Sequence, residues 1–332
     1  MILSAGYGTR LWPLTQDRTK PALPILGKPL VGYVAEYLAN FGCREIAVNL
    51  HHRPESVRQA LGDGSKFGVK LSYIDEPIIL GTSGALDNAR SFLDQETFLV
   101  VNGKIITDID LSAALSTHRA TKALATLVLL PNAARERFSV VETDVGLVRS
   151  FRGMPLESKQ ALEENHEEGG EGDVPLMFTG IQILEPRIFD YIPHGVFSHS
   201  TTDVYPQAIA KGERIAAHVA RGKWFELSTL PRYLDISLKL LAETGANVYS
   251  GRRSNIANSA AVKDSVLWDD VSVAAGAKVV RAVLGDGVRI GSGEVIENAA
   301  VVRATLLRNT TPPPKALDGY WQGENFVVPL AQ

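Results

Sequence analysis

The chain has 332 residues, a formal charge of −3 and 21% charged residues, a balance that gives no overall attraction to nucleic acid or to an anionic membrane surface. Its single cysteine, Cys43, excludes an internal disulfide and suits a reducing compartment. The longest apolar runs, such as residues 125–130, are too short to span a bilayer, and the first ten residues lack the features of a signal peptide. We therefore expect a cytoplasmic protein that binds neither nucleic acid nor membrane.

The first part of the chain, up to about residue 240, alternates short apolar runs with amphipathic segments. It predicts strands and helices in the order 1–6 (strand), 30–42 (helix), 45–50 (strand), 54–64 (helix), 69–74 (strand), 84–93 (helix) and 98–103 (strand), with later strands at 123–130, 138–144 and 176–184. These strands are continuous apolar runs, which favours a mostly parallel sheet covered by helices on both faces. We assign residues 1–245 to a Rossmann-like α/β domain.

A glutamate-rich stretch, residues 156–175, separates the last two of these strands. High charge and few large apolar residues are typical of a solvated surface loop. The sequence assigns no function to this loop, including its part between Glu163 and Asp173.

The pattern changes from about residue 255. Branched aliphatic residues recur mostly at intervals of six, with glycines and other small residues between them, at Ile256, Val262, Val273, Val279, Leu284, Ile290, Ile296 and Val302. This period suits a left-handed parallel β-helix, in which each hexapeptide forms one side of a triangular coil. We predict a second domain, residues 246–332, with roughly three coils of about 18 residues. Because so few coils leave open edges, we expect this domain to pack on the first domain or on another subunit, and we expect a homo-oligomer that forms through it. An irregular β-rich tail is the alternative.

The most specific local pattern follows the first predicted strand. A tight loop, Gly6–Arg10, comes directly after the strand, and Lys20 stands ten residues later. Glycines let backbone N–H groups approach phosphate oxygens, Arg10 offers a bidentate guanidinium, and Lys20 adds a second cation, so the segment suits a polyphosphate. It lacks the lysine pattern of a Walker A loop, and Leu11 occupies the third glycine position of a dinucleotide fingerprint.

This segment, G-x-G-T-R followed after nine residues by K-P and then "LPILGKPL", resembles the signature of the sugar-phosphate nucleotidyltransferases. "LGTSGALDNA" is similar to the family's L-G-T-A-G-A-L segment, and "VVNGKIITDIDL" to its V-V-N-G-D strand end. "FTGIQILEPRIFDYIP", "TTDVYPQAIAKG" and "KWFELSTLPRYL" also match family segments, and a hexapeptide tail is usual in the branches that make GDP-mannose or ADP-glucose. The mannose-1-phosphate guanylyltransferase branch is the most similar.

The resemblance implies a nucleotide-diphospho-sugar transferase fold and a reaction that joins a GTP-like nucleoside triphosphate to a sugar 1-phosphate, with Mg²⁺ as the cofactor and pyrophosphate as the second product. It implies that Arg10 and Lys20 hold the phosphates. The nucleotide would be lined by Leu3, Ala5, Gly6, Gly8 and Thr9, with Gly81 and Thr82 near the base. The sugar-phosphate side would be formed by Asn102, Gly103, Arg152, Thr179 and Gly180.

The chain departs from the family pattern in the catalytic and sugar subsites. The family holds Mg²⁺ with two aspartates, and the corresponding positions are Lys104 and Glu226. An ammonium cannot ligate a cation and repels one, whereas Glu226 keeps a carboxylate on a longer arm. Other departures replace an acid, the lysine that grips the sugar phosphate, a strand glycine and a G-T-P turn; they lie at Arg152, Gly153, Ser139 and Ser228–Leu230.

Two hypotheses account for Lys104. In the first, its ammonium takes the place of Mg²⁺, paired with Glu226, and the enzyme works without a metal or with a metal held only by phosphates. In the second, the chain binds a nucleotide or nucleotide sugar without turnover and serves as a regulatory or assembly partner of an active relative. Because a buried lysine needs a counter-charge, we predict that Lys104 Nζ lies within salt-bridge distance of a Glu226 carboxylate oxygen.

Three other patterns have simpler interpretations. His51 and His52 follow a strand end, but without nearby cysteines or a third spaced histidine they indicate a polar loop and not a metal site. Asp108 and Asp110 are expected to cap the helix that follows them. All seven histidines lie at or before His218, ahead of the repeats, so the tail is expected to be structural and oligomerising and not an acyltransferase.

Overall fold

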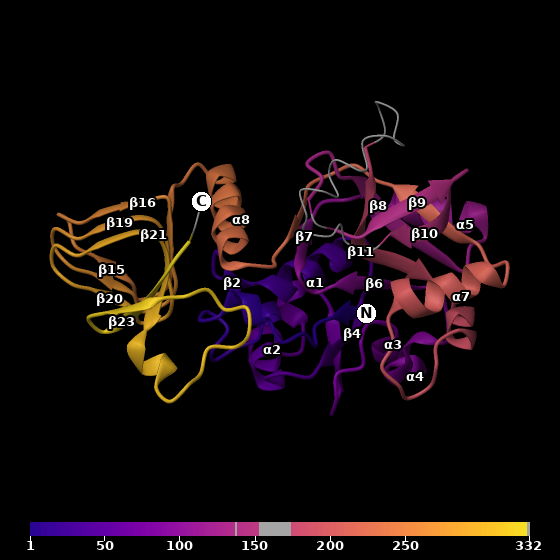
Figure 1. The fold of residues 1–332 in the computed structure, drawn as a ribbon, viewed down its shortest axis with the longest axis horizontal. Coiled ribbons are helices and arrows are strands. Elements are labelled where there is room, and N and C mark those ends of the chain that lie inside the picture. Colours follow the sequence, from indigo (N-terminus) through magenta and orange to yellow (C-terminus); the bar gives the residue numbers. More distant parts are fainter. Residues whose placement is uncertain (137, 153–173, 331–332) are drawn as a thin grey trace, which may run out of the picture.

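The computed structural model describes residues 1–136, 138–152 and 174–330, so most of the predicted acidic loop and Gly153 lie outside the described residues. The described chain forms two parts that lie end to end along the long axis of the molecule (Figure 1). An α/β part contains the N-terminus, and a stack of short strands forms the other end. Within the described residues, none of the helices has the length and apolar character needed to cross a bilayer.

A nine-stranded sheet forms the centre of the α/β part, in the order β5-β4-β1-β6-β11-β8-β12-β10-β9. Strands β5, β4, β1 and β6 are parallel neighbours, whereas β11 runs antiparallel to both β6 and β8. The bounds of the nine strands are β1 Ile2–Leu3, β4 Glu45–Leu50, β5 Lys70–Asp75, β6 Phe98–Asn102, β8 Ala125–Pro131, β9 Val140–Asp144, β10 Leu147–Arg152, β11 Leu176–Leu184 and β12 Ile215–Val219. The predicted fold class is confirmed, with a sheet that becomes mixed from β11 onward.

Helices cover both faces of this sheet, which explains the continuous apolar strands. On β6, for example, Val101 packs in the core beneath α1, α2 and α5, and its neighbour Val100 packs in the core beneath α3, α4 and α7. The helices are α1 Leu30–Asn40, α2 Pro54–Leu61, α3 Ser83–Asn88, α4 Arg90–Leu93, α5 Leu111–Thr121, α7 Tyr205–Ala210 and α8 Leu230–Glu243. Two small antiparallel ribbons complete this part, formed by β2 Pro24–Ile25 with β3 Lys28–Pro29 and by β7 Ile105–Thr107 with β13 Trp224–Glu226.

The second part is the predicted β-helix. Its strands are β14 Val248–Ser250, β15 Asn255–Ile256, β16 Ala261–Lys263, β17 Ser265–Leu267, β18 Ser272–Val273, β19 Lys278–Leu284, β20 Arg289–Ile290 and β21 Val295–Arg303. Parallel pairing places Val262 beside Val279 and Val279 beside Ile296, an offset of 17 residues. The expected coil of about 18 residues is therefore one residue too long, because one side of each coil is a pentapeptide.

The shorter side changes which residue points inward. Leu267, Leu284 and Val301 form the third inward row, each fully buried in the coil's own core. Val302, predicted to point into the coil, is buried instead against the α/β part. The coil turns at residues with positive φ that also repeat every 17 positions, at Asp264, Arg281 and Asn298.

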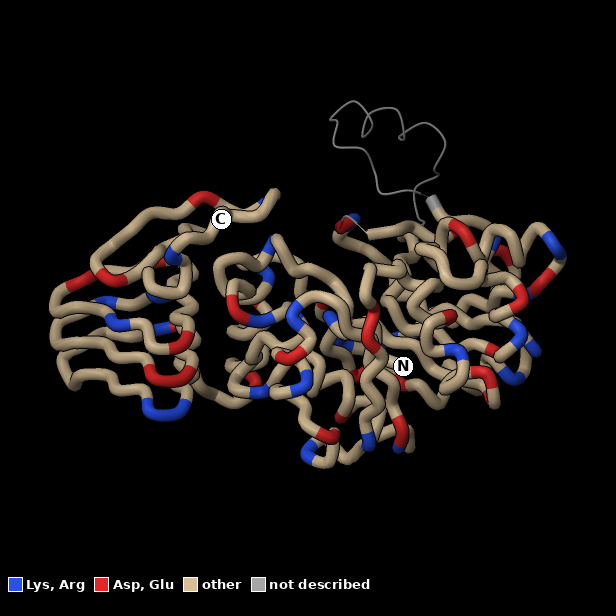
Figure 2. The backbone as a smooth tube through the Cα atoms, turned by 90° about the horizontal axis from the view of Figure 1, so that it is seen from below, with Lys and Arg blue, Asp and Glu red and all other residues tan. Residues whose placement is uncertain are grey.

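Ion pairs reinforce another corner of the coils. Arg252 Nη2 lies 2.7 Å from Asp269 Oδ2, and Arg253 Nη2 lies 2.6 Å from Asp270 Oδ2, each pair being 17 residues apart. Figure 2 shows basic and acidic segments on successive coils. A terminal hairpin covers the last coil: it consists of β22 Tyr320–Gln322 and β23 Asn325–Pro329, and β23 pairs antiparallel with β21.

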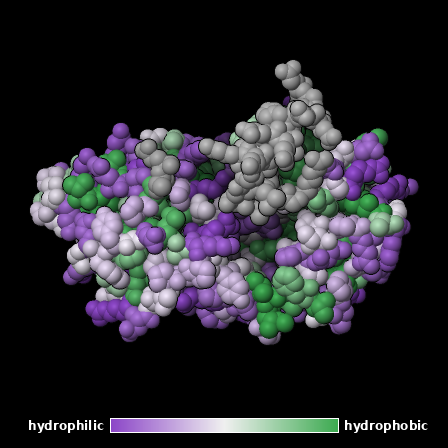
Figure 3. Space-filling model, viewed as in Figure 1, coloured by the Kyte–Doolittle hydropathy of each residue, from purple (hydrophilic) through white to green (hydrophobic). Residues whose placement is uncertain are grey.

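A shared apolar core joins the two parts. It contains α/β residues such as Leu14 and Leu23 and β-helix residues such as Val283 and Phe326, and α8 packs against β17 and β19. This matches the expectation that a short β-helix needs a covering surface. The face in Figure 3 shows apolar residues in small patches among polar ones.

Candidate active site

The glycine-rich loop lies at the carboxyl end of β1, where parallel α/β sheets place their ligands. Ser4 N, just after the strand, donates to Asn49 Oδ1 at 2.7 Å, so the start of the loop is tied to the end of β4. Gly8 comes so close to Lys20 that a Cβ at Gly8 would lie 3.1 Å from Lys20 Cβ. Arg10 is the exposed residue of the turn Thr9–Leu11 (η1), so Arg10 and Lys20 lie on the two sides of one segment.

Lys20 is half-buried and lies in a cluster of charges. Burial, followed by the charge of Lys104, lowers the pKa of Lys20 from 10.5 to about 8; Glu226 raises it and Arg10 lowers it further. One electrostatic environment therefore contains four charged groups from three distant parts of the sequence: Arg10, Lys20, Lys104 and Glu226. Three of them are cationic when protonated, which suits a ligand with several negative charges.

Lys104 and Glu226 form the predicted ion pair. Lys104 Nζ lies 2.9 Å from Glu226 Oε1, and the two side chains are 32% and 12% exposed. The ribbon of β7 and β13 fixes them, since Glu226 pairs with Ile105 and Leu227 N donates to Lys104 O at 2.9 Å. Lys104 thus stands directly before β7, with its ammonium held across the ribbon by a carboxylate.

These residues do not fit the Mg²⁺ site that the resemblance implies. The ammonium of Lys104 has only donors, and it already engages the one carboxylate that remains. No cluster of three or more His, Cys, Asp or Glu side chains suited to a metal ion occurs in the described ranges. The next acids in the chain have other partners, because Asp108 Oδ1 accepts from Lys223 N and Asp110 Oδ1 from Ser112 N.

The predicted sugar side is assembled where β6 meets β11. A Cβ at Gly180, whose φ is +81°, would lie 2.1 Å from Asn102 Nδ2, so only glycine lets the middle of β11 come this close to the end of β6. A Cβ at Gly103 would lie 2.9 Å from Leu3 O. The residue after β6 therefore also lies close to the backbone at the start of the glycine-rich loop. Thr179 O accepts from Trp224 Nε1 at 3.0 Å, which ties β11 to the ribbon that carries Glu226.

Gly81 and Thr82, predicted near the base, pack against residues 198–200. A Cβ at Gly81 would lie 2.4 Å from Ser198 O, and Thr82 Oγ1 accepts from Ser200 N at 2.9 Å. These contacts hold the start of α3 against the segment that leads into α7. Gly81 and Thr82 are therefore held in place by contacts with the backbone of residues 198–200.

Two buried residues that sequence reasoning missed connect these pieces. Asn49 Nδ2 donates to Glu76 Oε1 at 2.7 Å, and Glu76 Oε2 accepts from Leu80 N at 3.1 Å. Together with the bond from Ser4 N, they link the glycine-rich loop to the segment before Gly81. Burial raises the pKa of Glu76, with the bonds from Asn49 and Leu80 acting in the opposite direction. A polar residue at the end of the buried run "EIAVNL" was the signal that could have found Asn49.

Other predicted residues have mixed outcomes. Asp110 caps α5 as predicted, whereas Asp108 was wrongly expected to do so and binds Lys223 N instead. His51 was expected in a polar loop and has two specific partners, Glu76 O at 2.8 Å and the hydroxyl of Tyr7 at 3.2 Å. Arg152 ends β10, where its backbone pairs with Val140. Its predicted role in holding the sugar phosphate remains a prediction.

Comparisons with known proteins identify the family of the chain. Residues 1–243 match the family model described as nucleotidyl transferase, and residues 247–311 match one described as GlmU-like, C-terminal hexapeptide. A UTP–glucose-1-phosphate uridylyltransferase of Synechocystis is 28% identical over 92% of this chain and 83% of its own length. A mannose-1-phosphate guanylyltransferase of Mycobacterium tuberculosis is 26% identical over 90% and 82%, respectively.

Two further comparisons cover mainly the α/β part. An N-acetylmuramate alpha-1-phosphate uridylyltransferase of Neisseria meningitidis is 33% identical over 70% of this chain and 94% of its own length. The structure of HddC from Yersinia pseudotuberculosis complexed with GMP-PN has the same fold, with a TM-score of 0.59 at 22% identity over 72% of this chain and 97% of that chain. The chain therefore belongs to the nucleotidyl transferase family, within its sugar-1-phosphate group, and carries a hexapeptide-repeat domain.

Proposed function

We propose that the protein transfers a guanylyl group from GTP to mannose 1-phosphate in the cytoplasm, giving GDP-mannose and pyrophosphate. The observation that carries nucleotidyl transfer is the cluster of Arg10, Lys20 and Lys104 around the glycine-rich loop at the end of β1. The choice of GTP and mannose 1-phosphate rests on the similarity to mannose-1-phosphate guanylyltransferases. In this proposal residues 1–245 carry the reaction and residues 246–332 serve homo-oligomer assembly.

The proposed reaction exchanges one phosphoanhydride bond for another. An oxygen of the sugar phosphate attacks the α-phosphorus of the triphosphate, a new P–O bond forms, and the bond to the β-phosphate oxygen breaks, so that pyrophosphate leaves with its electron pair. Positioning and neutralisation of charge account for most of the catalysis of such a step. Arg10 and Lys20 hold the triphosphate beside Leu3, Ala5, Gly6, Gly8 and Thr9, with the base near Gly81 and Thr82. The sugar phosphate lies against Asn102, Gly103, Arg152, Thr179 and Gly180.

Lys104 supplies the charge that a metal supplies in relatives. With Lys20 protonated, three cations and the carboxylate of Glu226 sum to a formal charge of +2. Two cations, two carboxylates and one Mg²⁺, the arrangement that the resemblance implies, also sum to +2. A lysine at position 104 therefore keeps the formal charge that faces the nucleotide, and it removes a side chain that could coordinate a metal ion. Glu226 holds the ammonium in position and reduces the cost of bringing it close to Lys20.

The second candidate function is binding without turnover, as a regulatory or assembly partner of an active relative. The Lys104–Glu226 ion pair favours it, because an ammonium is a point charge that cannot polarise the reacting phosphate as a coordinated metal ion does. In this case the loop and its cations bind a nucleotide or nucleotide sugar, and no bond is broken.

A pyrophosphate-release assay on the full chain distinguishes the two candidates. It is run with GTP, ATP, UTP and dTTP, each against mannose 1-phosphate and glucose 1-phosphate, with Mg²⁺ and with EDTA. We expect release with GTP and mannose 1-phosphate that survives EDTA. Release with another pair would overturn the proposed substrates. Binding of a nucleotide in calorimetry with no release from any pair would establish the non-catalytic function instead.

A further inference from the structure

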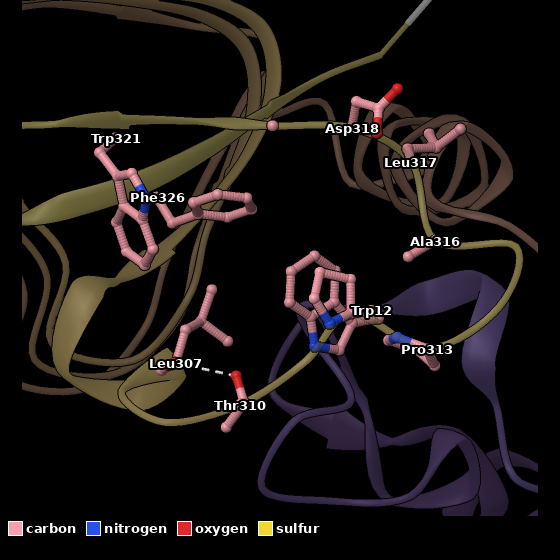
Figure 4. Close-up of a pocket in the computed structure, with 11 residues that line it drawn as sticks. Trp12, Leu307, Thr310, Pro313, Ala316, Leu317, Asp318, Trp321 and Phe326 are labelled. Carbon is pink, nitrogen blue, oxygen red and sulfur yellow. Dashed lines mark hydrogen bonds between the residues drawn. The ribbon is translucent and has the colours of Figure 1, made fainter.

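The segment between Arg10 and Lys20 packs directly on the β-helix. Trp12 follows the turn that carries Arg10, and its ring lies 5.5 Å from the ring of Phe326. Figure 4 shows Trp12 facing Leu307 and Thr310 across a pocket. The volume of this pocket is about 500 Å³. Leu14, a little further along, is fully buried in the shared core. Arg10 and Lys20, which are proposed to bind the phosphates, are therefore joined by a segment that packs against the β-helix.

Arg18, two residues before Lys20, makes a polar contact across this interface. Its Nη2 lies 2.6 Å from Asp286 Oδ2 on the β-helix, and its guanidinium lies 5.1 Å from the centre of the Trp268 ring. The same guanidinium makes a two-pronged contact with Asp17, at 2.8 and 2.9 Å. Burial lowers the pKa of Arg18, and the carboxylates of Asp17 and Asp286 outweigh it and raise the pKa overall. The orientation of Arg18 is thus fixed from three sides.

Asp286 is itself held rigidly by the coil. Its Oδ1 accepts from Asp269 N at 3.0 Å, a bond to the coil below, while Oδ2 faces Arg18. The two oxygens of this carboxylate therefore make different connections, because Oδ1 joins two coils and Oδ2 joins the coils to the α/β part. A carboxylate fixed in this way positions its partner more strictly than a flexible surface acid.

The other side of the segment is bonded to the glycine-rich loop. Thr15 Oγ1 donates to Gly8 O and Thr19 Oγ1 donates to Gly6 O, both at 3.2 Å. Arg18 lies between these two threonines in the chain. A movement of Arg18 would therefore be transmitted to the carbonyls of Gly6 and Gly8, in the loop proposed to bind the phosphates, and to Lys20.

We propose that Arg18 and Asp286 are positioning residues for the triphosphate, through which the β-helix holds the glycine-rich loop and Lys20 in their binding geometry. The inference rests on the proposed function in that the loop binds a triphosphate. It gives the β-helix a role in ligand binding in addition to assembly. Loss of the contact should weaken binding of the phosphates and leave binding of the base unchanged.

The test compares Asp286→Asn with a matched control, Asp270→Asn, which removes the Arg253–Asp270 pair within the β-helix. Calorimetry on the full chain measures the affinities of GTP and of guanosine, which has no phosphates. For Asp286→Asn we expect the Kd of GTP to rise about fivefold or more, the lower end of typical coupling between sites, with the Kd of guanosine unchanged. Asp270→Asn should change neither Kd.

A second variant, Arg18→Lys, keeps the charge and loses the planar fork, so it should raise the Kd of GTP even if Asp286→Asn fails to fold. Wild-type affinity for GTP in both variants would overturn the positioning role. So would an equal loss of GTP and guanosine affinity, which indicates a general distortion. A wild-type chain that binds none of the four nucleoside triphosphates would overturn the proposed function itself, an outcome distinct from either of these.

Discussion

The two halves of the site differ in how far they keep the family's chemistry. The phosphate half, from Gly6 to Lys20, keeps every residue that the resemblance requires, and its loop is bonded to β4, to its own following segment and, through Arg18, to the β-helix. In the half where the sugar phosphate and the α-phosphate would meet, Lys104 stands at a position where the resemblance implies a metal ligand, and it forms an ion pair with Glu226.

The comparison of the two halves distinguishes two contributions of a metal ion to such a site: its positive charge and its coordination of oxygen atoms. The ammonium of Lys104 preserves the total charge of the site, which governs how strongly a polyphosphate is attracted. It cannot reproduce coordination, which orients the reacting oxygens and stabilises the charge that develops in the transition state. Binding should therefore tolerate this substitution far better than turnover does, and the following changes test that division.

The largest effect is expected from Lys104→Asp. The new carboxylate would lie beside Glu226 and recreate a two-acid site for a divalent cation. Mg²⁺-dependent pyrophosphate release should rise on the order of 100-fold above wild type, because a coordinated metal contributes several kcal/mol to transition-state stabilisation. Calorimetry with Mn²⁺ should show a binding site in the variant.

Lys104→Gln is the control, since it removes the ammonium without supplying a ligand for a cation. It should show no Mg²⁺-dependent gain and weaker GTP binding than wild type. If Lys104→Asp binds Mn²⁺ and still gives no turnover, the sugar half has been lost through more than one position, and the non-catalytic function gains support.

The next effect concerns the geometry of the sugar half. Gly180→Ala places a Cβ 2.1 Å from Asn102 Nδ2 at a φ of +81°, and should lower the free energy of unfolding by about 2 to 4 kcal/mol through overpacking and backbone strain. Gly146→Ala is the matched control, because its φ of +74° is similar and nothing lies within 4 Å of the added Cβ. It should cost only about 1 kcal/mol in urea denaturation.

Adding Asn102→Ala to Gly180→Ala should restore part of the lost stability, since it removes the atom that the new Cβ meets. Equal losses in the two glycine variants would show that the sugar half is loosely packed. That result would indicate that this half is packed less tightly than the phosphate half.

The sequence predicted the general plan of the fold well because each part has its own periodicity. Two-sided burial produces continuous apolar strands, and the hexapeptide pattern predicts coils even at low identity to any relative. The coil length was wrong by one residue because a single shortened side shifts the register, so that Val301 and not Val302 points inward. Spacing alone cannot locate such a pentapeptide side when both neighbouring positions are valines.

The site was predictable where its chemistry follows from local spacing. Arg10, Lys20 and the Lys104–Glu226 pair could be proposed from motifs and from the requirement that a buried lysine has a counter-charge. Asn49 and Glu76 could not, because they act through hydrogen bonds between three strand ends that only the fold brings together. The contact between Arg18 and Asp286 spans 268 positions in the chain and was hidden for the same reason.

A smaller effect tests the electrostatics of the phosphate half. Because the pKa of Lys20 is lowered to about 8 by burial and then by Lys104, its ammonium is present at pH 7 and lost above pH 8. The affinity for GTP should fall about tenfold between pH 7 and pH 9, as one charge-assisted contact is lost. Calorimetry in two buffers with different ionisation enthalpies should detect proton uptake on binding near pH 8.

Two variants bracket this pH effect. Lys20→Arg keeps its charge throughout the range, so its affinity should stay constant from pH 7 to pH 9. Lys104→Gln removes the neighbouring positive charge and should move the fall in affinity to higher pH. A pH profile that is identical in wild type and Lys20→Arg would show that Lys20 does not contact the phosphates.

The smallest effect separates the halves most directly. Trp224→Phe removes the indole N–H that donates to Thr179 O at 3.0 Å and keeps most of the ring that packs against Phe138. It should cost about 1 kcal/mol of stability, the usual value of one such bond. Because Thr179 is proposed to lie on the sugar side, the KM for the sugar phosphate should rise several-fold while the KM for GTP stays unchanged. Trp321→Phe, at an indole that is 59% exposed, is the control and should alter neither. Equal changes in both KM values for Trp224→Phe would show that the two halves respond as one unit. In that case the substitution at Lys104 would also affect the phosphate loop.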